Sequence, residues 1–289
     1  MTIIKRIAFF FLLLLFLLGG TMVFIVWKYE DDLKNFALDS ARSAIVTDIE
    51  FNENVVLSFW SDFPLVAVEI EDIRIEDSFR TDTLLSVKKA FVQFDLIKLL
   101  KNEITIEGIR VTDGFLRLRR NASDQWNYRV WKTSDSNDNK AKTDFSIEIL
   151  TLENIQLDYD DRNVDLNIQF LSEKSRIKGR FTDENQRLGI SLNGFMQRLT
   201  TNGADRIIDL PLNIAGVLNI NSAEKIYTIE MANAILAGSE MVLDAEWRGL
   251  EDGTNMEMKV HAGNIEPASL LPHIWPQMPE NIRALNLTG

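Results

Sequence analysis

Two stretches of the sequence share one pattern and decide the fold: Val68-Glu-Ile-Glu-Asp-Ile-Arg-Ile-Glu-Asp-Ser-Phe79 and Ile104-Thr-Ile-Glu-Gly-Ile-Arg-Val-Thr-Asp-Gly-Phe115. Six of their twelve positions are identical, and apolar residues alternate with polar ones, as is typical of β-strands with one buried face. A third segment, 145–154, repeats the apolar pattern. Repeats spaced by 36 and 41 residues predict units of a few strands each, which must stack side by side to bury their apolar faces.

The alternation slips by one residue in each copy of this repeat. A β-bulge at the slip would keep both halves of the strand facing the same side. We therefore expect bulges directly after Ile70, Ile106 and Ile147, where the slip is occupied by Asp72, Gly108 and Ile149.

Period-two alternation continues through the rest of the chain. The clearest further runs are Asp165-Leu-Asn-Ile-Gln-Phe170, Leu188-Gly-Ile-Ser-Leu192 and Met256-Glu-Met-Lys-Val260. Turn residues separate the expected strands at Asp113-Gly114, Asn202-Gly203 and Asp252-Gly253. The polar stretch 132–143 predicts a mobile loop or a boundary between sub-regions, and short helices are expected over 96–101 and 268–275.

The pattern predicts a mainly β body over residues 49–289, built as an elongated antiparallel sheet with a few short helices. About fifteen strands spaced by roughly 4.8 Å would give a sheet about 70 Å long. One face of this sheet would be apolar along its whole length. No segment has the pattern of a separate covering domain, so we expect the sheet to curl on itself.

An apolar segment at the N-terminus predicts a membrane anchor. Residues 7–27 contain no charge, and at 1.5 Å per residue they span about 30 Å, the thickness of the hydrocarbon core of a bilayer. The run is too long for the apolar core of a cleaved signal peptide. Lys5 and Arg6 precede it and only Lys28 directly follows it, which places residues 1–6 in the cytoplasm and the body on the other side of the membrane.

A short amphipathic helix is expected over residues 30–47, because Leu33, Phe36, Ala37, Ala41 and Ala44 recur at helical spacing. Two interpretations remain open for its apolar side. The helix could pack over the end of the β body, or it could lie on the membrane surface or close the mouth of a groove.

Composition excludes several classes of function. A net charge of −12 argues against a nucleic-acid partner, and the absence of cysteine excludes disulfides and cysteine-based metal sites. The only two histidines, His261 and His273, have no clustered acidic ligands nearby in the sequence, and no catalytic motif is present. We expect no cofactor, no metal and no enzymatic activity.

The stretch Phe94-Asp-Leu-Ile-Lys-Leu-Leu-Lys-Asn-Glu-Ile-Thr-Ile-Glu-Gly-Ile-Arg-Val111 resembles the AsmA family of Gram-negative envelope proteins. The preceding Phe63-Pro64 resembles the family as well. The later Trp126-Asn-Tyr128 is similar to the family's closing turn, and Asp124 stands where that turn carries glycine. The resemblance covers roughly residues 1–160. It implies a twisted repeating β-groove with an apolar concave face, anchored in the inner membrane with its body in the periplasm.

Proteins of this kind are implicated in moving phospholipid between the inner and outer membranes or in outer-membrane assembly. The resemblance thus implies phospholipid and the inner membrane as partners, and outer-membrane assembly proteins if the chain acts instead as an interaction scaffold. Family members are usually longer, so the sequence is either a fragment or forms a short groove. The residues expected to line the groove, unless they pack against one another as an ordinary core, are Val68, Ile70, Ile73, Ile75, Ile104, Ile106, Ile109, Val111, Ile147, Leu150 and Leu152.

Overall fold

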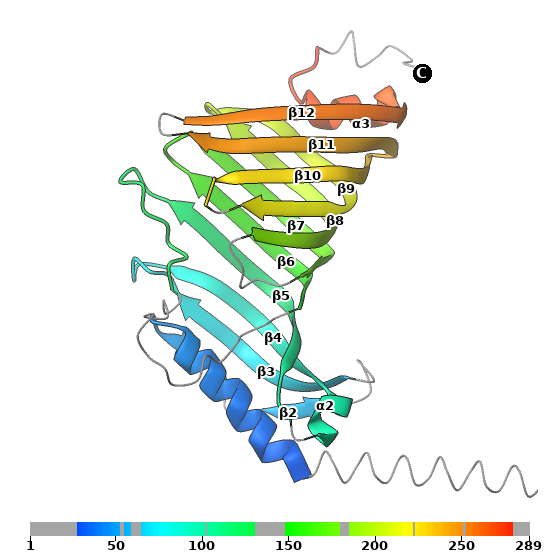
Figure 1. The fold of residues 1–289 in the computed structure, drawn as a ribbon. Coiled ribbons are helices and arrows are strands. Elements are labelled where there is room, and N and C mark those ends of the chain that lie inside the picture. Colours follow the sequence, from blue (N-terminus) through cyan, green and yellow to red (C-terminus); the bar gives the residue numbers. More distant parts are fainter. Residues whose placement is uncertain are drawn as a thin grey trace, which may run out of the picture.

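The computed structural model describes residues 28–52, 55–58, 65–101, 103–130, 148–179, 185–221, 223–250 and 253–279 (Figure 1). The predicted anchor at 7–27 and the predicted loop at 132–143 lie outside these ranges. Within them, no helix combines the length and the apolar character needed to cross a bilayer.

The described part of the chain is mainly β, as predicted. Its strands form one long twisted sheet, seen in Figure 1 from the cyan strands near the N-terminus to the orange ones near the C-terminus. The strands are β1 (Ile49–Glu50), β2 (Val56–Ser58), β3 (Leu65–Glu76), β4 (Thr83–Asp95), β5 (Ile106–Arg120), β6 (Ile149–Asp161), β7 (Leu166–Lys178), β8 (Asn185–Thr201), β9 (Ala204–Asn221), β10 (Ile226–Leu236), β11 (Ser239–Leu250) and β12 (Gly253–Asn264).

The strands follow one another across the sheet almost in chain order. β1 and β2 both pair with β3, and β3 to β12 lie side by side in sequence order. The described residues form twelve strands instead of the expected fifteen or so, because the strands are long, reaching 18 residues in β9. At roughly 4.8 Å per strand, the eleven strands of the path span about 50 Å rather than 70 Å.

One pair departs from the predicted antiparallel arrangement. β5 and β6 run parallel, whereas every other pair is antiparallel. Parallel neighbours need a long return connection, and the chain has room for one between Arg120 at the end of β5 and Ile149 at the start of β6. Alternation of apolar residues does not reveal strand direction, so the pattern alone could not predict this pair.

The turn predictions have different outcomes. Asn202-Gly203 forms the turn between β8 and β9, as expected. The prediction of a turn at Asp113-Gly114 is wrong, because both residues lie inside β5. Asp113 does have the left-handed φ of 56° that such a dipeptide favours, but the strand continues through it.

Residues with a left-handed backbone conformation interrupt the regular strand geometry along one line across the sheet. Asp72 in β3, Asp113 in β5 and Asn154 in β6 have φ values of 54°, 56° and 53°. The slip predicted at Asp72 is confirmed, since Ile70 and Ile73 on either side of it are both buried. The slip after Ile106 is also confirmed, because the pairing of β4 with β5 shifts there by one residue.

In the third copy the irregularity lies at Asn154 and not at the predicted Ile149, which pairs regularly with both neighbouring strands. The left-handed residues are therefore spaced by 41 residues twice. Cross-strand pairing places Asp113 beside Asn154 in the sheet. A spacing of 41 residues therefore aligns the irregular positions of neighbouring strands, whereas the spacing of 36 residues between the first two copies in the sequence does not.

Helices cover parts of one face of the sheet. The helix over residues 28–44 packs against β3 and β4 through the fully buried Leu33 and Ala37, and Phe36 meets the ring of Phe94 edge-on at 6.2 Å between centroids. This outcome agrees with the first of the two interpretations of the predicted helix. The two further helices, α2 (Leu96–Leu100) and α3 (Pro267–Ile274), lie where the sequence predicts them.

Candidate functional site

Cross-strand pairing places apolar side chains in continuous rows on one face of the sheet. Residues paired on neighbouring strands point to the same side, so each row can be followed from strand to strand. One row crosses seven strands, from β3 to β9, through Ile75, Leu85, Leu116, Leu157, Phe170, Met196 and Leu210. A second row crosses six strands, from β3 to β8, through Val68, Val92, Ile109, Leu150, Ile177 and Ile190.

Burial divides this apolar face into two regions. In the second row, Val68 and Val92 are buried at 0% and 8% exposure, whereas the side chains from Ile109 to Ile190 are only half-buried. The change occurs where the strands leave the helix over residues 28–44. We call the buried part, formed by β3–β5 and this helix, the covered region.

The half-buried part continues the same face over β6–β8. On these strands Ile155, Phe170 and Leu188 are buried, whereas six other apolar side chains are half-buried and belong to neither of the two buried clusters of the described residues. We call this set the open face; it consists of Leu150, Leu157, Ile168, Ile177, Ile190 and Leu199.

A second helix covers the far side of the open face. α3 packs on β9 and β11, where Leu270 joins Leu210, Ala234 and Met241 in a small buried cluster. His273 contributes an Nδ1 contact of 3.0 Å to the carbonyl oxygen of Ile208. Figure 1 shows the helix over residues 28–44 at one end of the sheet and α3 at the other. The open face therefore lies between two helix-covered ends.

The opposite face of the sheet is polar. Lys89 binds Glu69 and lies 3.2 Å from Glu71, and these partners raise the pKa of Lys89. Glu153 forms ion pairs with Arg110 and Lys174 at 3.7 Å and 2.9 Å. Such exposed pairs contribute little to stability individually, but they keep this face hydrated. The sheet is thus amphipathic, with apolar side chains gathered on one side.

The open face ends in a polar and aromatic border, which we call the lip. It comprises Arg120, Trp126, Tyr128, Tyr159 and Asp161 at the ends of β5 and β6 and in the segment that follows β5. Pairing of Arg120 with Asp161 and with Trp126 puts these side chains on the apolar face. The Trp126 ring lies 5.2 Å from Tyr128 and 5.8 Å from Tyr159, between ring centroids.

Charge in the lip is balanced locally. The Arg120 guanidinium lies 3.1 Å from Asp161, binds Asp124 and stacks 5.4 Å from the centre of the Trp126 ring. Burial and the neighbouring Asp161 carboxylate raise the pKa of Tyr159 to about 12, so this phenol is neutral at physiological pH. Asp124 has a left-handed φ of 62°, a conformation that glycine adopts most readily.

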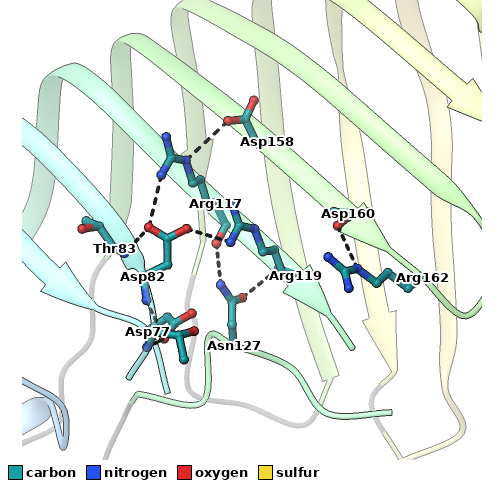
Figure 2. A network of polar contacts seen from close by, with 10 residues as sticks. Asp77, Asp82, Thr83, Arg117, Arg119, Asn127, Asp158, Asp160 and Arg162 are labelled. Atoms are coloured by element: carbon teal, nitrogen blue, oxygen red, sulfur yellow. Dashed lines mark hydrogen bonds and ion pairs between the residues drawn. The ribbon is translucent and has the colours of Figure 1, made fainter. Parts of the chain in front are cut away.

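A second polar network holds the neighbouring strand ends together on the polar side (Figure 2). Asp82 accepts hydrogen bonds from Arg117 and Arg119 at 3.4 Å and 2.7 Å. The fully buried Asn127 accepts from the Arg119 backbone N–H at 2.7 Å and donates to the Arg117 carbonyl at 2.9 Å. These contacts fasten the segment after β5 to the sheet and so position Trp126 and Tyr128.

The predicted lining residues fall mostly in the covered region. Val68, Ile70, Ile73, Ile75 and Val111 are buried there. Partly buried and packed against this core are Ile104, Ile106, Ile109 and Leu152. Leu150 alone among the predicted residues belongs to the open face, and Ile147 lies outside the described residues.

The other five residues of the open face were missed by the sequence analysis. Ile168 and Ile190 belong to alternating runs that the sequence does show, but these runs lie outside the internal repeat on which the prediction relied. The position of the helix over residues 28–44 decides which half of the apolar face is covered, and alternation carries no information about it.

The side chains that define the open face are all apolar. Within the described ranges, no three acidic or histidine side chains lie close enough together to bind a metal ion. The model of the AsmA family matches residues 1–259 of the chain. Neither the comparison with curated proteins nor the one with solved structures gave a match.

Proposed function

The chain belongs to the AsmA family, and we propose that it is a membrane-anchored protein whose open face shields the acyl chains of phospholipids. The observation that carries this proposal is the change of burial along the row from Val68 to Ile190, in which the side chains on β3 and β4 are buried and those on β5 to β8 are half-buried. Apolar side chains that gather on one face without being fully covered are typical of a binding surface.

The size of the open face suits an acyl chain. Ile168 and Ile177 lie nine residues apart on β7, which corresponds to roughly 30 Å along the strand. One leaflet of a bilayer has a hydrocarbon layer about 15 Å thick, half of the 30 Å core. An extended acyl chain therefore fits along the strands of the open face without reaching the polar face.

The predicted topology gives this surface its setting. We propose that residues 7–27 anchor the chain in the inner membrane of a Gram-negative cell, with the N-terminus in the cytoplasm and the β body in the periplasm. Phospholipid from that membrane is then the expected cargo, and the protein contributes to lipid transport toward the outer membrane. Apolar contact with acyl chains requires no cofactor and no catalytic residue.

The experiment compares two added charges on adjacent residues of β7. Ile168→Glu puts a carboxylate on the open face, and Gln169→Glu puts the same group on the polar face next to it. The full chain is purified in detergent, and bound phospholipid is measured by native mass spectrometry and lipid extraction. A charge without a partner in an apolar contact costs several kcal/mol, so we expect Ile168→Glu to lose at least about ten-fold of the bound lipid.

Gln169→Glu should retain phospholipid at the level of the unaltered chain. Circular dichroism must show the same β content for both variants, so that loss of lipid is not loss of fold. A folded Ile168→Glu protein that carries as much lipid as the control would refute the proposal.

A second candidate function rests on one specific observation, the free edge of β12. Of the described residues, only β11 pairs with this 12-residue strand. Unpaired strand edges recruit other strands. An interaction scaffold for proteins that assemble in the outer membrane would use this edge, and cross-linking from exposed positions such as Lys259 would then capture a polypeptide while Ile168→Glu left the capture unchanged.

A further inference from the structure

The lip lies one step beyond the apolar rows of the open face. Leu118 pairs with Tyr159, Tyr159 with Ile168 and Ile168 with Leu199, so this row begins beneath the lip and ends in the open face. The next row toward the strand ends begins with the charged pair Arg120 and Asp161 and continues through Leu166 and Thr201. A lipid whose acyl chain lies along the open face can therefore place its polar end at the lip.

Arg120 is the cation of the lip and has donor capacity to spare. Its Nε is buried and has no hydrogen-bond partner among the described residues. One of its two carboxylate partners, Asp124, is 66% exposed on a turn, and ion pairs of such exposed groups contribute only about 0–1 kcal/mol. A phosphate group can therefore compete with Asp124 for the Nη2 end of the guanidinium, because hydrogen bonds between arginine and phosphate are strong.

The aromatic residues of the lip provide a place for a cation. The Trp126 ring contacts the rings of both Tyr128 and Tyr159, with centroids less than 6 Å apart in each pair. Tyr128 is 40% exposed. Faces of aromatic rings attract ammonium groups. Arg120 already stacks on the Trp126 ring, and the exposed Tyr128 ring beside it can accept a second cation.

Net charge decides which headgroup fits. The ion-paired side chains at the lip are those of Arg120, Asp124 and Asp161, one arginine and two aspartates, which leaves a surplus of one negative charge. A headgroup with a net negative charge is repelled by this surplus, whereas one with a phosphate and an ammonium group is neutral overall and finds a partner for each charge.

We propose that the lip selects phospholipids with a zwitterionic headgroup, with the phosphate on Arg120 and the ammonium group against the Trp126 and Tyr128 rings and the nearby carboxylates. This inference rests on the proposed function, since it assumes that acyl chains occupy the open face. It adds the class of lipid and the direction in which the lipid lies: polar end at the Arg120 end of the strands and acyl chains toward Ile177 and Ile190.

The test uses three lipids with the same oleoyl chains: phosphatidylethanolamine, phosphatidylglycerol and the neutral diacylglycerol. Each is offered to the full chain in detergent, and the bound fraction is measured by native mass spectrometry. Repulsion by a single surface charge is worth about 1 kcal/mol at short range, so we expect about five-fold more bound phosphatidylethanolamine than phosphatidylglycerol.

Two variants change the headgroup contacts without touching the open face. Asp124→Asn removes the surplus charge at a left-handed position that asparagine tolerates, and should reduce the preference to within about two-fold. Tyr128→Ala removes an exposed ring and should lower binding of phosphatidylethanolamine about three-fold while binding of diacylglycerol stays unchanged. The matched control is Asp72→Asn, which makes the same substitution at a left-handed, exposed residue of β3 and should change nothing.

The outcomes separate the two proposals. Equal binding of the three lipids, or a preference for phosphatidylglycerol that Asp124→Asn does not alter, would overturn headgroup selection and leave the open face as a binding surface for acyl chains. A chain that binds none of the three lipids, diacylglycerol included, would overturn the proposed function and this inference with it.

Discussion

The covered region and the open face are built from the same rows of apolar residues, yet they differ in burial. In the covered region, Val68, Val92 and Phe94 are buried against one another and against the helix over residues 28–44. In the open face, Ile177 and Ile190 continue the row of Val68 but remain half-buried. One strand pattern therefore forms both a buried core and a half-buried surface, and the covering helix distinguishes them.

The two regions should also differ in what their side chains contribute to stability. A buried side chain stabilises the fold through burial and packing, whereas a half-buried one keeps much of its contact with water in both the folded and the unfolded state. The open face is therefore free to vary in shape and to be covered by a ligand. Stability is concentrated where the helix packs.

The largest expected effect contrasts truncations in the two regions. Phe94→Ala removes a fully buried ring that meets Phe36 edge-on, and should lower the free energy of unfolding by about 3–5 kcal/mol. Leu157→Ala removes a half-buried side chain of the open face and should cost about 1 kcal/mol or less in lipid-free protein. Urea unfolding followed by circular dichroism measures both. Equal losses would mean that the open face is packed as tightly as the covered region.

A smaller effect is expected from glycines in the two regions. A Cβ atom at Gly114 would lie 2.0 Å from the Ser86 carbonyl oxygen and 2.7 Å from Val87 Cα, so Gly114→Ala forces β4 and β5 apart. We expect a loss of about 1–3 kcal/mol in urea unfolding. The same change at Gly189 in β8 meets only the Lys178 carbonyl oxygen at 3.7 Å and serves as the matched control. A Gly114→Ala protein as stable as Gly189→Ala would show that the strand spacing beside the left-handed residues is not tight.

The smallest effect concerns the ion pairs that border both regions. The backbone N–H of Thr83 and the Arg119 guanidinium lower the pKa of Asp82 below its ordinary value of 3.8. A carboxylate with a lowered pKa stabilises the fold at neutral pH, and this contribution is lost as the pH falls through the lowered pKa. Asp82→Asn should therefore cost at most about 1 kcal/mol at pH 7, and the difference from the unaltered chain should shrink as the pH falls below 3.8.

Thermal unfolding of the two proteins between pH 7 and pH 3 checks this dependence. The control is Asp244→Asn, in the middle of β11 and remote in the chain from Arg117 and Arg119. The stability difference between this variant and the unaltered chain should not show the pH dependence expected for Asp82→Asn. A difference between Asp82→Asn and the unaltered chain that stays constant over the whole range would exclude the carboxylate charge as its cause.

Local patterns predict the elements of this fold well. Alternation located the strands, and the left-handed Asp72 lies at the slip in the pattern of β3 where a bulge was expected. The helices α2 and α3 also follow from their local sequences, as the Asp95 cap at the start of α2 illustrates. These features depend on residues close together in the chain, so a single sequence contains the information needed.

Features that depend on distant residues were predicted less well. The parallel pairing of β5 with β6 depends on where residues 121–148 return the chain, and the division of the apolar face depends on where the helix over residues 28–44 packs. The lip was missed for the same reason. Trp126 and Tyr159 are 33 positions apart in the sequence, and only the pairing of Arg120 with both Trp126 and Asp161 brings their rings to one place.

The absence of cysteine permits the most direct test of the division between covered region and open face. Single cysteines are introduced at Leu157 on the open face, at its neighbour Gln156 on the polar face and at Val68 in the covered region, and maleimide labelling of the full chain is measured with and without phospholipid. We predict that Leu157→Cys is labelled without lipid and protected by it, that Gln156→Cys is labelled equally in both conditions, and that Val68→Cys stays unlabelled. If lipid instead leaves the labelling of Leu157→Cys unchanged, the open face does not hold acyl chains and the central claim is contradicted.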